Sequence, residues 1–241
     1  MGKERKVHYG QCMVLSPEEW QAVRLSLTVA LRAVALGLPL AIGAAFLIGR
    51  GRFPGRPLLD ALVHLPLVLP PVVTGWILLV LFGVRGPLGR PLLDWFGVRL
   101  VFTTEGAALA TAVMSFPLIV RAVRLSLDAL DPGLEAAART LGAGPVDRFF
   151  TVTLPLILPG VLAGAVTAFA AGLGEFGAVI TFVSNIPGET QTLPLAIYSA
   201  TQVPGGEATA ARLSAVSLVL AIGLLLAAEG LGRRMQAWLG R

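Results

Sequence analysis

The chain has little charge and almost no cysteine, and each shortage excludes a class of protein. Only 14% of its 241 residues are charged, whereas a soluble domain carries about 25%. The sequence therefore lacks the charge that a soluble surface needs. The single cysteine, Cys12, excludes a disulfide framework and a cysteine-based metal cluster. No apolar core lies within the first 20 residues, so we expect no cleavable signal peptide.

The signature motifs of several enzyme classes are also missing. The two histidines, His8 and His64, lie far apart, and there is neither an HExxH zinc motif nor a GxSxG nucleophile motif. A Walker A loop, GxxxxGK(S/T), is missing too, so we expect no ATP hydrolysis by that route. The chain is interpreted as a non-enzyme without catalytic residues, metal site or cofactor of its own. His64 is interpreted as capping or packing near the start of an apolar segment.

Apolar residues are what the chain has in abundance, with 55% hydrophobic residues and a mean hydropathy of +0.79. A helix needs about 20 apolar residues to cross a bilayer. Five segments meet this need, at residues 24–48, 58–82, 106–123, 155–183 and 212–231. Residues 190–203 are expected to form a shorter re-entrant or interfacial helix. The pattern predicts an all-α polytopic membrane protein with five or six transmembrane helices.

Prolines and glycines mark where these segments bend or pack closely. The second segment is expected to kink or break, either as a static feature or as a hinge for gating, at Pro66, Pro70 and Pro71. In the fourth segment, Gly160 and Gly164 have the small-residue spacing that lets two helices approach closely.

Lys and Arg residues indicate the orientation, because they mark the cytoplasmic side of membrane proteins. With five spans, three regions fall on one side: residues 50–56, the long loop 124–153 and the C-terminal tail. Their basic residues lie closer to the membrane ends than those of the other side. We therefore expect the long loop and the C-terminus in the cytoplasm and the N-terminus outside. A sixth span would reverse the N-terminal end.

The long loop is the most informative part of the chain. Residues 135–142 read EAAARTLG, and a Leu-Pro pair follows at the start of the fourth segment. Asp131 and Pro132 are typical of a helix N-cap and first helical position. Gly142 begins a Gly-Ala-Gly-Pro turn. The loop thus has the form of a lever, with two short helical pieces joined by a glycine hinge, through which an external motor could move the membrane part.

This loop resembles the EAA loop in the membrane subunits of binding-protein-dependent ABC importers. Nine residues separate Gly142 from Val152-Thr-Leu-Pro, as in that family, whereas Ala136 stands at the family's Glu position. Glu135 lies one place earlier, which rotates a helical side chain by about 100°, so it is not expected to make the family's usual contact. Arg139 is either an ATPase contact or a solvated charge. The resemblance implies these ATPase-coupling residues: Glu135, Ala137, Ala138, Arg139, Gly142, Leu154 and Pro155.

Two other stretches narrow the resemblance within this family. Residues 64–75 (HLPLVLPPVVTG) and 114–122 resemble molybdate permease subunits. Residues 173–190 (LGEFGAVITFVSNIPGET) share Gly-Glu-Phe-Gly with sulfate permease subunits but are closer to the molybdate type. This favours molybdate or tungstate over sulfate or thiosulfate. The resemblance implies a type I ABC importer transmembrane domain at 21–232, with a coupling loop at 131–154, an N-terminal tail at 1–20 and a cytoplasmic tail at 233–241.

The resemblance also implies partners and a mechanism. Two copies of the chain would form a pathway in a prokaryotic cytoplasmic membrane, in contact with lipid and without nucleic acid. Two ATP-binding ABC subunits would hold ATP and Mg, and a periplasmic or lipid-anchored molybdate-binding protein would deliver the anion. The permease would then alternate between inward-open and outward-open states. Candidate pathway or gate residues are Thr74, Gly75, Glu175, Ser184 and Asn185.

Each of these residues also has a structural interpretation. Glu175 could pair with Arg32 or Arg212 inside the membrane, and its charge would repel a dianion. The polar residues among the others could be helix caps or turns. Two further function classes stay open at this point. An ATP-independent transporter or channel would need an in-chain relay or ion site, and a structural membrane partner would have no pathway.

Overall fold

A computed structural model describes residues 15–238, and the predicted all-α class is confirmed, with no strand in that range. The first fourteen residues of the predicted N-terminal tail, with His8 and Cys12, lie outside the described part, as do residues 239–241 of the C-terminal tail. The elements, in chain order, are α1 (Pro17–Arg50), α2 (Arg56–Val68), α3 (Pro71–Phe82), α4 (Gly89–Phe96), α5 (Thr104–Asp128), α6 (Pro132–Thr140), α7 (Pro145–Arg148), the π-helix η2 (Phe149–Thr153), α8 (Leu154–Leu173), α9 (Gly177–Val183), α10 (Leu193–Thr201) and α11 (Glu207–Trp238).

The described part contains four helices that are long and apolar enough to cross a membrane: α1, α5, the continuous stretch Pro145–Leu173, and α11 up to Gly230. Helices α2 and α3 pass the same test together, as one span bent by 116°. The number of spans in this part is therefore four, or up to five if the bent pair is one span. Each of the five predicted segments overlaps one of these spans, with the bent pair α2 and α3 counted as one.

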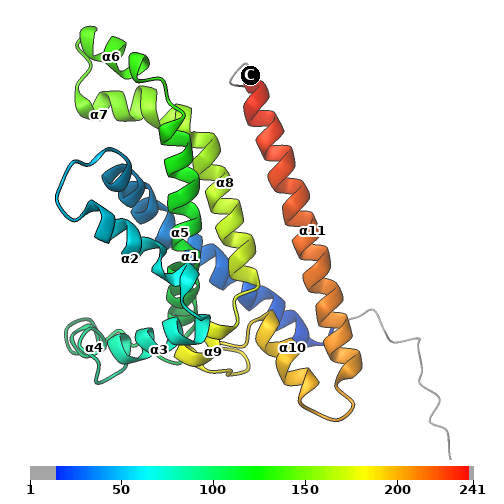
Figure 1. The fold of residues 1–241 in the computed structure, drawn as a ribbon. Helices are drawn as coiled ribbons and strands as arrows, with labels where there is room; N and C mark the ends of the chain where they lie inside the picture. The colour runs from blue at the N-terminus through cyan, green and yellow to red at the C-terminus, as the bar shows by residue number, and fades with distance from the viewer. Residues whose placement is uncertain (1–14, 239–241) are drawn as a thin grey trace, which may run out of the picture.

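The spans give the molecule two distinct ends (Figure 1). Helices α1, α5 and α8 pack against one another. At one end, α6 and α7 project beyond them, and the C-terminal part of α11 reaches the same level. We call this the loop end. Helices α3, α4, α9 and α10 lie at the other end, the far end. The long loop and the C-terminal part of α11 thus share one end, as expected from five crossings.

The second predicted segment breaks where its prolines cluster. Helix α2 ends at Val68, and α3 begins at Pro71. A proline is tolerated in the first turn because its missing N–H would have no partner there. Pro66 lies inside α2, and the helix continues past it. Pro70 and Pro71 therefore make the predicted break, whereas Pro66 does not end the helix.

The fourth predicted segment, 155–183, is wrong as a single helix. Helix α8 ends at Leu173, and α9 starts separately at Gly177. Between them, the carboxylate of Glu175 accepts a hydrogen bond of 2.9 Å from the backbone N–H of Ala178. This contact satisfies one of the N–H groups that a new helix start leaves without a partner. The short helix expected within 190–203 is present as α10.

The glycines of α8 allow it to lie very close to α5, as their spacing predicts. A Cβ atom on Gly160 would lie 1.8 Å from Ser126 Oγ and 2.9 Å from the carbonyl oxygen of Ala122. A Cβ atom on Gly164 would lie 3.2 Å from the Cα atom of Ile119. The two helices therefore touch through backbone atoms at these glycines.

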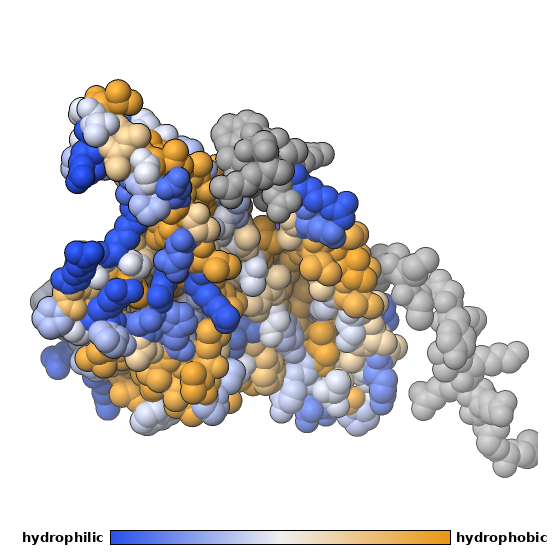
Figure 2. Space-filling model, turned by 45° about the horizontal axis from the view of Figure 1, so that its top comes forward, coloured by the Kyte–Doolittle hydropathy of each residue, from blue (hydrophilic) through white to orange (hydrophobic). Residues whose placement is uncertain are grey.

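The surface matches a bilayer environment. Figure 2 shows broad apolar areas over the body of the molecule, and many of the strongly hydrophilic side chains gather toward the loop end. Large exposed apolar side chains occur along the spans, such as Leu40 on α1 and Val219 on α11. Such a surface is stable against lipid and unstable against water.

Candidate functional site

The predicted coupling loop, residues 131–154, lies at the loop end and starts with the short helix that the sequence predicts. Asp131 caps α6, because its Oδ1 accepts a hydrogen bond of 2.8 Å from the N–H of Gly133. The chain leaves α6 through Gly142, whose φ of +87° is a left-handed conformation that suits glycine. Pro145 starts α7 at its first position. A sharp glycine turn thus joins α6 to α7, which continues through η2 into α8.

The predicted coupling loop, which projects at the loop end (Figure 1), exposes several large apolar side chains. Leu141 is 88% exposed, and Val146 is 69% exposed; Leu134 and Phe150 are exposed as well. Exposed apolar groups that gather on a polar segment are typical of a protein-binding surface. Among the predicted coupling residues, Ala137, Arg139 and Gly142 are exposed, whereas Ala138, Leu154 and Pro155 are partly buried.

Glu135 instead contacts other helices of the same chain. It forms an ion pair with Arg50, the last residue of α1, through both carboxylate oxygens. The hydroxyl of Thr153, at the end of η2, donates a hydrogen bond of 2.6 Å to Glu135 Oε1. The Arg50 guanidinium holds the pKa of the Glu135 carboxyl below its usual range, although partial burial works in the other direction. The charge of Glu135 is therefore paired within the same chain, with Arg50 and Thr153.

Aromatic residues join the returning part of the loop to the same helix end. The rings of Phe46 on α1 and Phe149 on η2 meet edge to face, with centroids 5.2 Å apart. The Arg50 guanidinium lies 5.8 Å from the centroid of the Phe46 ring. Sequence reasoning missed Arg50, Phe46 and Phe149, because no local pattern marks contacts between residues this far apart in the chain.

A second ion pair ties α2 to α5 just before the loop. The guanidinium of Arg124 lies 2.7 Å from Asp60 Oδ1. His64 is partly buried on α2, with Nδ1 2.9 Å from the carbonyl oxygen of Asp60 and 3.1 Å from its Oδ1. The first half of the bent pair is thus fixed to the helix that enters the coupling loop.

The predicted pathway or gate residues come together around α9 at the far end. Thr74 on α3 is only 5% exposed, and its hydroxyl has no hydrogen-bond partner among the described residues. Gly75 lies against α9 so closely that a Cβ atom would be 2.6 Å from the carbonyl oxygen of Ala178. Ser184 ends α9 with a φ of +64°. Asn185 donates a hydrogen bond of 2.7 Å to Ser199 on α10.

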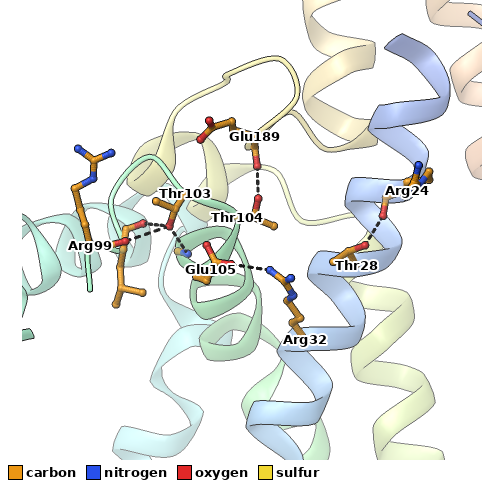
Figure 3. Close-up of polar contacts among 10 residues, drawn as sticks. Arg24, Thr28, Arg32, Arg99, Thr103, Thr104, Glu105 and Glu189 are labelled. Atoms are coloured by element: carbon orange, nitrogen blue, oxygen red, sulfur yellow. Dashed lines mark hydrogen bonds and ion pairs between the residues drawn. The ribbon is translucent and has the colours of Figure 1, made fainter. Parts of the chain in front are cut away.

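The proposed pairing of Glu175 with Arg32 or Arg212 is wrong. Arg32 forms an ion pair of 2.8 Å with Glu105 at the start of α5, as Figure 3 shows. Arg212 forms one of 2.6 Å with Glu19 on α1. Each arginine therefore has a carboxylate on a helix next to its own, while the Glu175 carboxylate is used at the start of α9.

Neighbouring polar contacts around Glu105 fix the far end of α5. Thr103 caps that helix through a hydrogen bond of 3.1 Å from the N–H of Gly106. Thr104 donates one of 2.7 Å to the carbonyl oxygen of Glu189, which lies in the loop between α9 and α10 (Figure 3). The start of α5 is therefore held to both α1 and the α9–α10 loop.

Comparison with known proteins gives consistent matches over nearly the whole chain. The family of binding-protein-dependent transport system inner membrane components matches residues 23–237. The chain is 58% identical, over 95% of its length and 100% of the relative's, to the molybdenum transport system permease protein ModB of Escherichia coli strain K12. It is 54% identical to ModB of Haemophilus influenzae, over 92% of this chain and 97% of that protein. It is 40% identical to the sulfate transport system permease protein CysW of Synechococcus elongatus, over 83% of this chain and 70% of that protein.

Solved structures share the fold at lower identity. A chain of the bacterial alginate ABC transporter, in complex with an alginate-bound periplasmic protein, matches with a TM-score of 0.74 and 19% identity, over 91% of this chain and 80% of that one. A chain of an amino acid ABC transporter with histidines matches with a TM-score of 0.63 and 20% identity, over 92% of this chain and 100% of that one. At these identities the likeness concerns the fold alone.

Proposed function

The chain belongs to the family of binding-protein-dependent transport system inner membrane components, and from this premise we propose that it is the permease subunit of a molybdate importer. The expected fold, a type I ABC importer transmembrane domain, is confirmed by the matching chains. The observation that carries the substrate class is the 58% identity with a molybdenum permease over the full length of that protein. Tungstate, an oxyanion of the same shape and charge, is the expected competitor.

In the proposed assembly, two copies of this chain form the pathway, and one ATP-binding subunit docks on the coupling loop of each copy. The exposed apolar side chains of the loop, led by Leu141 and Val146, support such a contact. ATP and Mg would be held by those subunits, because this sequence has no Walker A loop. A separate binding protein would bring the anion to the far end, and the loop end would face the cytoplasm.

The contacts of the loop suggest how a docked subunit would act. Movement of α6 and α7 passes directly into α5 and α8, which enter and leave the loop. The Arg124–Asp60 ion pair carries the movement on to α2. The bend between α2 and α3 then meets α9 at the far end, where the gate candidates gather. A motor that binds one arrangement of these helices more tightly than the other shifts the permease between its two open states.

Thr74 is the pathway residue that we propose first. A buried hydroxyl without a protein partner can donate a hydrogen bond to an oxyanion, and buried polar groups in proteins normally have such a partner. The negative charge of Glu175 makes it a poor anion ligand, and its contact with Ala178 gives it a structural role at the start of α9.

Two measurements test this function. The tagged chain should bring down an ATP-binding subunit during purification, and its absence would count against the importer. In vesicles that hold the complete transporter, ATP should drive uptake of molybdate that tungstate reduces and that sulfate at equal concentration leaves unchanged. Stronger competition by sulfate would support the alternative sulfate or thiosulfate permease. Uptake that continues without ATP would support an ATP-independent transporter.

A further inference from the structure

We propose that Glu135 is a positioning residue that joins the coupling helix α6 to the loop end of α1, so that movement of the loop also drives α1. The inference rests on the proposed docking of α6 on an ATP-binding subunit. It assigns Glu135 a contact within its own chain, in place of a contact with the ATPase.

The geometry around Glu135 carries this role. Its two carboxylate oxygens both accept from Arg50 Nη1, which lies 85 residues away at the end of α1. Oε1 also accepts a hydrogen bond from the hydroxyl of Thr153, at the end of η2. One carboxylate on α6 therefore contacts two other elements, α1 and η2. Hydrogen bonds to an ionised group are stronger than neutral ones and hold a fixed direction.

A second contact, between two aromatic rings, joins the returning part of the loop to α1. The edge-to-face rings of Phe46 and Phe149 pack one turn below the ion pair on α1, and Arg50 lies beside the Phe46 ring. The polar contact holds α6, and the aromatic contact holds the returning segment η2. Helix α6 and the segment η2 are thus both attached to the last two turns of α1.

Helix α1 is long enough to carry this movement to the far end. Its 34 residues correspond to about 51 Å of helix at 1.5 Å per residue, and the helix continues through Pro39. Near its start, Ser26 Oγ accepts a hydrogen bond of 2.6 Å from the N–H of Leu193 on α10. Glu19 is paired with Arg212 on α11. Displacement of Arg50 would therefore be passed to α10 and to the start of α11.

The surroundings of Glu135 distinguish it from a docking residue. It is partly buried, and its carboxylate oxygens are occupied by Arg50 and Thr153, whereas Arg139 on the same helix is exposed. The one-residue displacement of Glu135 from the family position turns its side chain by about 100° around the helix. This rotation is consistent with a carboxylate that faces the spans.

The first test measures the junction itself, without any partner. Hydrogen exchange of residues 132–141 is followed in the solubilised chain for wild type, Glu135→Gln, Arg50→Gln and the charge swap Arg50→Glu/Glu135→Arg. Both single variants should exchange about fivefold faster, the factor that corresponds to about 1 kcal/mol, and the swap should restore protection. The matched control is Glu229→Gln, which breaks an exposed Glu–Arg pair within α11 and should leave this segment unchanged. Wild-type exchange in Glu135→Gln would overturn the proposal.

The second test measures coupling in the reconstituted transporter. Glu135→Gln should still bind the ATP-binding subunit, but it should hydrolyse several times more ATP for each molybdate imported, and the charge swap should lower that ratio again. Loss of ATPase binding in Glu135→Gln, or an unchanged ratio, would contradict the positioning role. Failure of the wild-type chain to import molybdate with ATP would instead contradict the proposed function, so the two failures can be told apart.

Discussion

The contact between α5 and α8 at Gly160 gives a sharp test of how closely these spans must pack. In the variant Gly160→Ala, the new Cβ atom would lie 1.8 Å from Ser126 Oγ and 2.9 Å from the carbonyl oxygen of Ala122. Both distances are below the optimal separation for carbon contacts, about 3.5–4.0 Å. The Ser126 side chain can rotate away, but the Ala122 oxygen is part of the helix backbone. The two helices therefore have to move apart.

Two opposing effects set the size of the change. Alanine is favoured over glycine inside a helix by about 1 kcal/mol. Overpacking of a close contact typically costs about 1–3 kcal/mol, and separation of α5 from α8 also loosens the buried cluster that contains Ile119, Val123 and Ile157. We therefore expect Gly160→Ala to lose up to about 2 kcal/mol of stability. A Cβ atom on Gly43 of α1 would have nothing within 4 Å. The variant Gly43→Ala therefore measures the gain in helix propensity without any overpacking.

The assay is thermal unfolding of the two variants and the wild type in the same detergent, followed by circular dichroism. A change of 1 kcal/mol corresponds to a shift of about 2–4 °C for a chain of this size. Gly43→Ala should raise the midpoint and Gly160→Ala should lower it. If Gly160→Ala raises the midpoint as much as Gly43→Ala does, the close contact between α5 and α8 is refuted.

Three further predictions concern the coupling loop and the gate region. Gly142→Pro should insert normally but uncouple ATP hydrolysis from uptake, because proline cannot adopt the φ of +87° there; unchanged uptake would count against the lever. Gly75→Val should abolish uptake but keep ATPase co-purification, since even a Cβ atom would lie 2.6 Å from the Ala178 carbonyl oxygen; wild-type uptake would show that this contact is not needed. The third follows from the lowered pKa of Glu135. Its stabilising contribution is complete above the ordinary carboxyl pKa of 4.5 and is lost as the pH falls through the lower folded value. A spin label at Ala137 should become mobile only in acid in wild type but at every pH in Glu135→Gln, and identical titrations of the two would contradict this.

The spans and the coupling loop could be predicted because their signals are local. A continuous apolar run marks α1 and α5, and the Asp-Pro pair at residues 131–132 marks the start of α6 within one turn. The glycine hinge at Gly142 is likewise a property of one short stretch, since a left-handed turn there requires no distant partner.

Long-range contacts and breaks inside apolar stretches could not be predicted in the same way. Most of residues 155–183 are apolar, and this pattern suggests one helix. The contact of Glu175 with Ala178 shows where a second helix starts. For Glu175, the sequence allows a pairing with distant arginines as well as a pathway role, because charges inside a membrane seek partners. The structure satisfies Glu175 three residues away, and Arg32 and Arg212 have closer carboxylates.

The distribution of polar contacts suggests which helix stays in place when the loop moves. At the loop end, ion pairs join α6 to α1 and α5 to α2. Helix α11 has its ion pair to α1 at the far end, through Arg212 and Glu19. An apolar cleft of about 580 Å³ is lined by parts of α8, α10 and α11. We expect this cleft to take up part of the change in spacing when α8 moves with the loop. On this argument the loop-end part of α11 follows the predicted coupling loop less closely than α1, α2, α5 and α8 do, while its start stays paired with α1.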